Sequence, residues 1–190
     1  MAGKKDEDSG LVGRFKQGDA FAFEEIVLRY QDRIYNVCRS ILGDPHDAED
    51  AAQEVFLKAF QSLGRFEPDA ALYTWLYRIA VNTCLDFKKS LFSRLLKRLF
   101  DDGEGLKELP SKSPSPEQTY ESKQIGARLY AALGGIPYKL RIVIVLKELE
   151  GLSYEEIAGI LDISVGTVKS RISRARERLK ELLKEFREQI

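Results

Sequence analysis

The sequence predicts an all-α protein made of two small helical domains that are joined by a flexible linker. Three observations indicate this fold class. Apolar residues recur at three- and four-residue steps over several long stretches. A Pro- and Ser-rich stretch interrupts this periodicity, and a helix-turn-helix pattern follows near the end of the chain. With 190 residues and 44% hydrophobic content, the chain is large enough to bury a core.

The first domain is predicted over residues 11–92. Its three amphipathic helices have short connections, which is typical of a small bundle. Asp19 is a suitable N-cap for the first helix, and Gly43 ends that helix. The preceding residues 1–10 are polar and are expected to be disordered. The three helices are predicted over residues 19–42, 45–63 and 70–90.

A flexible linker is predicted over residues 93–119, where prolines, glycines and serines replace the apolar periodicity. The basic, amphipathic stretch LFSRLLKRLF, residues 91–100, fits a continuation of the third helix or a helix on a membrane surface. We expect the continuation. Because no apolar run is long enough to cross a bilayer, stable membrane insertion is not expected.

The second domain is predicted over residues 120–190. Residues 142–145, IVIV, have strong strand propensity, but no second strand candidate lies nearby, so we expect a helix. Ser153 and Glu156 form a capping-box pattern at the start of a short helix. After a tight turn, Ser164 can cap a second helix, and this arrangement predicts a helix-turn-helix.

The second helix of this motif concentrates positive charge in a chain whose net charge is zero: residues 165–180 hold six cations and one anion. Its predicted buried stripe is Val168, Ile172, Ala175 and Leu179, which leaves the polar residues outside. In this motif the second helix enters the major groove, where arginine can pair with guanine. A merely solvated cationic face is the alternative, but cap, turn, stripe and charge all agree with DNA binding. The predicted DNA contacts are Thr167, Lys169, Ser170, Arg171, Ser173, Arg174 and Arg176.

Three stretches together resemble the group IV, or extracytoplasmic-function, sigma factors of bacterial RNA polymerase. DAEDAAQEVFLKAF, residues 47–60, is similar to the polymerase-binding helix of region 2. YTWLYRIAVNTCLDFKK, residues 73–89, is similar to the helix that melts the promoter and reads its minus-ten element. The helix-turn-helix resembles the minus-thirty-five reader of region 4. The resemblance implies an alternative sigma factor, active in the bacterial cytoplasm and in stress responses, that directs core polymerase to promoters and assists strand opening.

The resemblance also assigns roles to residues of the first domain. Asp50, Gln53 and Glu54 share one face of their predicted helix. In the family the matching face binds a coiled coil of the polymerase's largest subunit, and the polymerase flap is a further expected contact. The residues implied in minus-ten recognition are Arg65, Phe66, Arg78, Asn82, Asp86 and Lys89.

Some of these residues have two interpretations. Phe66 fits equally well as a stacking residue beside a flipped base and as a core residue. Trp75 fits the core better than a stacking role. Asp86 would repel phosphate, so it would accept a hydrogen bond from a base amine or orient Asn82. An anti-sigma factor is a further expected partner of the chain.

Other functions agree less well with the sequence. The acids near His46 could suggest a metal site, but acids at a helix start are favoured by the helix dipole, so we expect neither metal nor cofactor. The chain lacks a GxxxxGK[ST] loop and has one histidine, so we do not expect an enzyme. A two-domain helix-turn-helix regulator that binds duplex DNA independently of polymerase is the alternative, although it would not need residues 47–89. Cys38 and Cys84 are expected to be buried free thiols.

Overall fold

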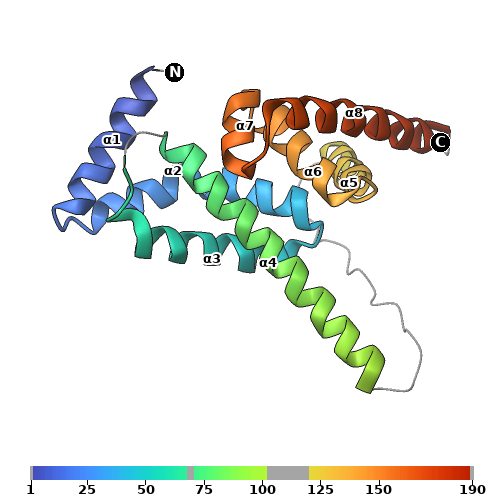
Figure 1. The fold of residues 1–190 in the computed structure, drawn as a ribbon, viewed down its shortest axis with the longest axis horizontal. Coiled ribbons are helices and arrows are strands. Elements are labelled where there is room, and N and C mark those ends of the chain that lie inside the picture. Colours follow the sequence, from blue (N-terminus) through green and yellow to red (C-terminus); the bar gives the residue numbers. More distant parts are fainter. Residues whose placement is uncertain (1, 68–70, 102–119, 189–190) are drawn as a thin grey trace.

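The computed structural model describes residues 2–67, 71–101 and 120–188, and in these ranges it contains helices and no strand, which confirms the all-α fold class. The helices form an N-terminal and a C-terminal group (Figure 1). In chain order they are α1 (Ala2–Lys16), α2 (Phe21–Leu42), α3 (Pro45–Leu63), α4 (Leu72–Asp101), α5 (Tyr120–Gly134), α6 (Tyr138–Ile144), the π-helical turn η1 (Val145–Leu149), α7 (Tyr154–Leu161) and α8 (Val165–Glu188).

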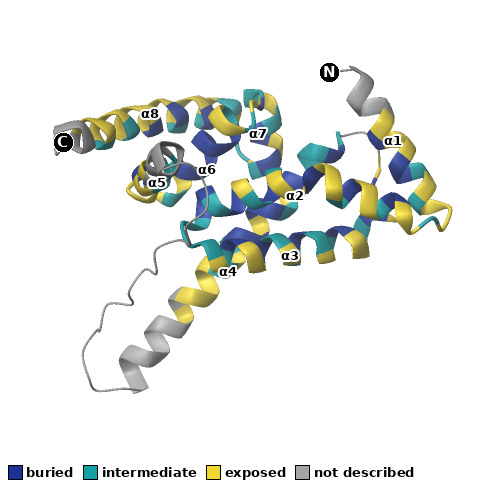
Figure 2. Cartoon of the chain, turned by 180° about the vertical axis from the view of Figure 1, so that it is seen from behind, coloured by how far each residue is buried: buried dark blue, intermediate teal, exposed yellow. Residues whose placement is uncertain are grey.

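Helices α2, α3 and α4 form the predicted three-helix bundle, and their buried residues lie along the sides that face one another (Figure 2). The buried positions of α2 recur at three- and four-residue steps, which places one continuous apolar stripe against the neighbouring helices. The buried apolar side chains of α2 are Ala22, Ile26, Tyr30, Ile34, Val37, Cys38 and Ile41.

The turn between α2 and α3 is fixed by backbone conformation and by a helix cap. Gly43 has a φ of 88°, a conformation that glycine adopts without the steric cost of a side chain. The Asp44 carboxylate accepts hydrogen bonds from the backbone N–H groups of His46 at 2.8 Å and Asp47 at 3.0 Å. Pro45 then occupies the start of the helix. As a result, α3 begins at Pro45, where the sequence predicts. Its end at Leu63 also agrees with the prediction.

Helix α1 differs from the prediction, because residues 2–10 are helical rather than disordered. The Asp8 carboxylate is buried against α2, where it accepts hydrogen bonds from the Tyr30 hydroxyl at 2.6 Å and the Arg29 guanidinium at 2.8 Å. These partners satisfy a polar group whose burial would otherwise be unfavourable. Asp19 accepts a hydrogen bond from the backbone N–H of Phe21 at 3.0 Å at the start of α2, where a cap is predicted.

Helix α4 is longer than the predicted span of 70–90. The stretch LFSRLLKRLF continues the same helix, as predicted, and carries it away from the other helices (Figure 1). Residues 93–101 of the predicted linker are therefore helical. The rest of the predicted linker, residues 102–119, lies outside the described residues.

The C-terminal group confirms the predicted helix over residues 142–145. Ile142, Val143 and Ile144 lie in α6, Val145 begins η1, and all four are buried. Strand propensity reflects packing on a half-buried pleated surface, so full burial inside a helical core overrides it here.

The two groups pack against each other. Helix α2 contacts α5, α6 and η1, and α4 contacts α7. Buried residues of both groups form one continuous core. Inside the N-terminal group, Cys38 and Cys84 are buried free thiols, as predicted. A hydrogen bond with Cys38 and burial both raise the pKa of the Cys84 thiol.

Candidate nucleic-acid and partner interfaces

Helix α8 holds its cationic residues on the side opposite the core. The predicted stripe residues Val168, Ile172 and Ala175 are buried and fix the helix against the rest of the C-terminal group. The Ser164 hydroxyl accepts a hydrogen bond from the backbone N–H of Thr167 at 3.1 Å and caps α8, as predicted. The rotation of α8 about its own axis is therefore fixed by packing and by the cap.

The polar side chains of α8 differ in how freely they can reach a ligand. Arg176 donates hydrogen bonds to Glu148 at 3.0 and 2.7 Å, and these bonds raise the pKa of Arg176. Arg171 and Arg174 form no ion pair with any residue whose side chain the structure describes, and Arg174 is the more exposed of the two. Of the predicted DNA contacts, Thr167 and Arg171 are partly exposed, and the exposed ones are Lys169, Ser170, Ser173, Arg174 and Arg176.

The predicted minus-ten face of α4 is exposed at Arg78, Asn82, Asp86 and Lys89. The Lys89 ammonium lies 3.6 Å from the Asp86 carboxylate, so the negative charge at this position is partly offset by its neighbour. Arg78 differs from the others, since its guanidinium donates a hydrogen bond to the backbone carbonyl of Gly159 in α7 at 2.5 Å. One predicted DNA contact is thus engaged by the C-terminal group.

The loop before α4 contains Arg65, which is exposed, and Phe66, which is only 6% exposed. The Phe66 ring packs on Trp75 with ring centroids 5.1 Å apart, and Lys16 donates a hydrogen bond to the Phe66 carbonyl at 2.6 Å. Of the two interpretations of Phe66, this structure therefore has the core one. Trp75 is partly buried and packs on the same core, as predicted. Residues 68–70 lie outside the described residues.

The acidic face of α3 contains Asp50 and Gln53, both exposed, and Glu54, which is partly exposed. Lys58 lies 3.5 Å from the Glu54 carboxylate, one helical turn further on. Of the three predicted polymerase contacts, Gln53 also lines the groove described next.

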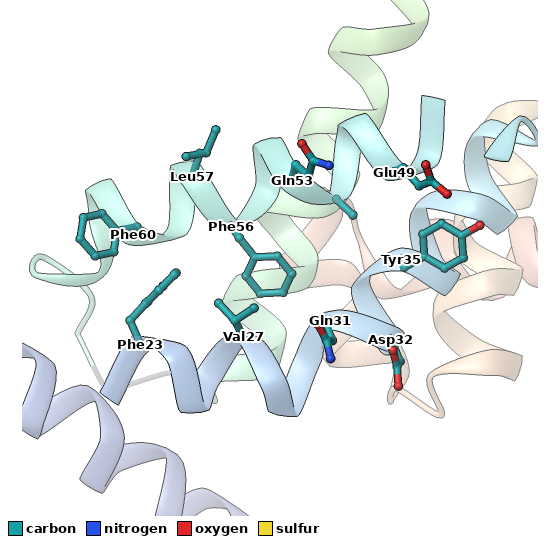
Figure 3. Close-up of a pocket in the computed structure, with 11 residues that line it drawn as sticks. Phe23, Val27, Gln31, Asp32, Tyr35, Glu49, Gln53, Phe56, Leu57 and Phe60 are labelled. Atoms are coloured by element: carbon teal, nitrogen blue, oxygen red, sulfur yellow. The ribbon is translucent and has the colours of Figure 1, made fainter. Parts of the chain in front are cut away.

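An open groove of about 730 Å³ runs between α2 and α3 (Figure 3). Leu57 and Phe60 are 58% and 49% exposed along it, although both are large apolar residues of α3. The apolar periodicity of the helices does not predict this groove; Leu57, an apolar residue on the polar side of α3, is a sequence signal for it. Apolar residues line one end and polar residues the other; the lining residues are Phe23, Val27, Gln31, Asp32, Tyr35, Glu49, Ala52, Gln53, Phe56, Leu57 and Phe60.

Two other kinds of site, a metal-binding cluster and a membrane-spanning helix, are not found in the described part of the chain. His, Cys, Asp and Glu side chains nowhere gather there in a group of three or more that could hold a metal ion. Among the described helices, none combines the length and apolar character needed to cross a membrane.

The chain resembles known proteins over both groups of helices. Family models match residues 26–101 as sigma-70 region 2 and residues 126–179 as sigma-70 region 4. The RNA polymerase sigma-H factor of Pseudomonas aeruginosa is 38% identical over 190 residues, with 94% of this chain and 95% of that protein covered. The ECF RNA polymerase sigma-E factor of Escherichia coli K12 is 40% identical over 178 residues, with 90% and 91% covered. This chain belongs to the extracytoplasmic-function sigma factors.

The fold of this sigma factor is shared with a solved structure of the sigma factor RpoE in complex with the anti-sigma factor NepR from Bartonella quintana. The two chains are 29% identical, the TM-score is 0.67, and the match covers 85% of this chain and 96% of the other. Helices α3 and α4 fall inside the region 2 match, and α6, η1 and α7 fall inside the region 4 match. We therefore call the N-terminal group region 2 and the C-terminal group region 4.

Proposed function

We propose that this sigma factor docks on core RNA polymerase through α3 and the adjoining groove, reads the minus-thirty-five element with α8 and reads the minus-ten strand with α4. One observation carries the proposal: a cationic reading helix and a separate acidic face beside an open apolar groove occur in the same chain. A regulator that binds duplex DNA independently of polymerase needs the first surface but has no use for the second.

The docking surface suits a basic, amphipathic helix, such as one arm of the largest-subunit coiled coil. The apolar end of the groove, around Leu57 and Phe60, can accept apolar side chains, which removes them from water. Asp50 and Glu54, on the same helix, can pair with cations of that partner. The polymerase flap is the second contact that we propose, and we assign no residues to it.

On α8 we assign base reading to Arg174, and phosphate contacts mainly to Lys169 and Arg171. Arg174 is exposed, and it need not break an ion pair with a described residue before reaching a guanine edge. Arg176 would first have to leave Glu148, so we assign it a weaker contact. The remaining contacts, hydroxyls that can reach phosphate or base, are Thr167, Ser170 and Ser173.

On α4 we assign base reading to Asn82, because its amide can pair with a base edge and its side chain is exposed. Arg78 and Lys89 hold the backbone of the unstacked strand. The ion pair between Lys89 and Asp86 supports a role for Asp86 in holding that lysine in place. In this proposal Arg65 is the DNA contact in the loop before α4, and the buried Phe66 holds that loop against the core by packing on Trp75.

The chemistry of RNA synthesis belongs to core polymerase in this proposal, and the sigma factor itself contributes binding and strand capture without catalysis. Core polymerase and promoter DNA lie in the bacterial cytoplasm, so we place the protein in the cytoplasm as well. We also expect an anti-sigma partner, since the relative with the shared fold was solved with one.

The experiment that tests the function is run-off transcription with core polymerase and a library of random promoters. We expect transcripts that require both proteins and that share two sequence elements upstream of their starts. A double variant, Asp50→Lys with Glu54→Lys, is the matched control, since it reverses charge on the docking face and leaves the DNA-reading residues unchanged. Duplex binding by the chain with no core-dependent transcript would instead favour the independent regulator.

A further inference from the structure

The last residue of α1 contacts the loop before α4. The Lys16 ammonium donates a hydrogen bond to the backbone carbonyl of Phe66 at 2.6 Å, across 50 residues of sequence. A hydrogen bond from a charged donor is roughly twice as strong as one between neutral groups. Lys16 is otherwise exposed, so this bond joins two segments at the surface and adds nothing to the apolar core. The loop before α4 is thus bonded to a helix far from it in the sequence.

The loop start, which we define as Arg65 and Phe66, is held from three helices. The Phe66 backbone N–H donates a hydrogen bond to the carbonyl of Leu63, the last residue of α3, at 3.1 Å. Its buried ring packs on Trp75 of α4 with ring centroids 5.1 Å apart, and its carbonyl accepts the hydrogen bond from Lys16 of α1. Consecutive Cα atoms are about 3.8 Å apart, so the position of Phe66 also limits where the exposed Arg65 side chain begins.

The end of α1 is itself fixed, so it can support the loop start. The Arg14 guanidinium lies 2.7 Å from the Asp19 carboxylate, which follows the end of α1. The Phe15 ring packs on Phe60 of α3 with ring centroids 5.4 Å apart. Both contacts come from the helical turn that ends at Lys16. A side chain positions another group only when its own backbone is held by packing and by polar contacts, and Lys16 meets this condition.

Resting on the function proposed above, we propose that Lys16 is a positioning residue for minus-ten recognition: by bonding the Phe66 carbonyl, it holds the loop start in place and presents Arg65 to the unstacked strand. A contact residue that is already in place loses less conformational freedom when it binds, so it binds more tightly. The hydrogen bond carries this role, and Lys16 itself contacts no DNA.

The first test measures the loop start in the free protein. Trp75 is the only tryptophan of the chain, so its fluorescence reports the packing of Phe66 without a label. Lys16→Met keeps the length of the side chain and removes the donor. Loss of the hydrogen bond should raise the fraction of displaced loop starts roughly tenfold, and acrylamide should then quench Trp75 more strongly than in the parent. Lys16→Arg keeps a charged donor and should restore the parent's quenching.

Arg14→Met is the matched control for this measurement. It removes the same charge from the same turn of α1, but Arg14 pairs with Asp19 and Glu25 instead of the Phe66 carbonyl. The control should be quenched as the parent is, and helicity checks that every variant is folded. If folded Lys16→Met is quenched no more than the parent or than Arg14→Met, the hydrogen bond does not hold the loop start. Lys16→Arg that is quenched as strongly as Lys16→Met would lead to the same conclusion.

The second test measures promoter melting by the holoenzyme, on a promoter selected in the run-off experiment. Lys16→Met should slow melting, followed by permanganate reactivity, roughly tenfold. Binding of a minus-thirty-five duplex should not change, because the residues of α8 are unaltered. Lys16→Arg and Arg14→Met should both melt the promoter as the parent does. The slope of log affinity against log salt should also equal the parent's, since no phosphate contact is lost.

The outcomes of the second test separate the positioning role from the function on which it rests. Equal melting by the parent and by Lys16→Met would overturn the positioning role alone. A salt slope that falls by roughly 0.7 units in Lys16→Met would mean that Lys16 contacts a phosphate of the single strand, which also overturns the positioning role. A parent holoenzyme that selects no promoter, or does not melt it, would overturn the proposed function and the positioning role together. The quenching experiment needs neither polymerase nor DNA, so it decides in every case whether Lys16 holds the loop start.

Discussion

Replacing Arg174 by alanine tests the base-reading assignment on α8. Arg174 is exposed on the outer face and has no ion pair among the described residues, so its loss should leave the buried stripe and the fold unchanged. A bidentate arginine–guanine contact contributes about 1–3 kcal/mol of discrimination. At 1.4 kcal/mol per factor of ten, this corresponds to roughly 5- to 150-fold weaker binding.

The loss should be confined to one base position, because the alanine variant no longer distinguishes guanine there. Lys169→Ala should instead weaken all sequences alike and reduce the slope of log affinity against log salt by about one unit, since it removes a phosphate contact. The assay is binding of single-alanine variants to a panel of duplexes altered one base pair at a time, at several salt concentrations.

Arg178→Ala is the matched control for this experiment, because Arg178 pairs with Glu181 further along α8 and is not among the predicted contacts. It should bind nearly as the parent does. A uniform loss for Arg174→Ala, together with a loss at a single base pair for Arg171→Ala, would reverse the assignment. Unchanged binding by both variants would mean that α8 does not read DNA as proposed.

Three further predictions concern the other surfaces. The double variant Asp50→Lys, Glu54→Lys should stay folded and lose co-elution with core polymerase, because reversed charge repels a basic partner; normal co-elution would exclude this face as the docking site. Asn82→Ala should reduce promoter melting, measured by permanganate reactivity, far more than closed-complex binding, and equal melting would contradict its role on the unstacked strand. Ser153→Ala should lower the free energy of unfolding by about 1 kcal/mol in urea denaturation, because it removes the cap of α7, and an unchanged midpoint would mean that the cap is redundant.

Local patterns were sufficient for most of the helices. The spacing of apolar residues predicted α2, α3 and the buried side of α8, and Ser153 with Glu156 formed the capping box that their spacing indicated. These features depend on residues within one or two helical turns, which is the range over which a single sequence carries direct information.

The features that the sequence did not reveal depend on distant partners. Asp8 can be buried because Arg29 and Tyr30 donate hydrogen bonds to its carboxylate, and nothing in the polar start of the chain indicates those partners. Glu150 and Arg33 lie 117 residues apart and meet only after two groups of helices have packed together. Phe60 packs against the rings of Phe23 in α2 and Phe15 in α1 and is still 49% exposed, which the apolar period of α3 alone does not indicate.

The buried thiol pair has a consequence for how this protein can receive a signal. The thiolate is the form of cysteine that reacts with peroxides and disulfides, and burial together with the hydrogen bond to Cys38 keeps Cys84 protonated at neutral pH. Both sulfur atoms are also out of reach of solvent. We therefore expect the folded chain to be insensitive to mild oxidants. A response of transcription to redox conditions would then have to act on a partner such as the expected anti-sigma factor, and not on the thiols of this chain.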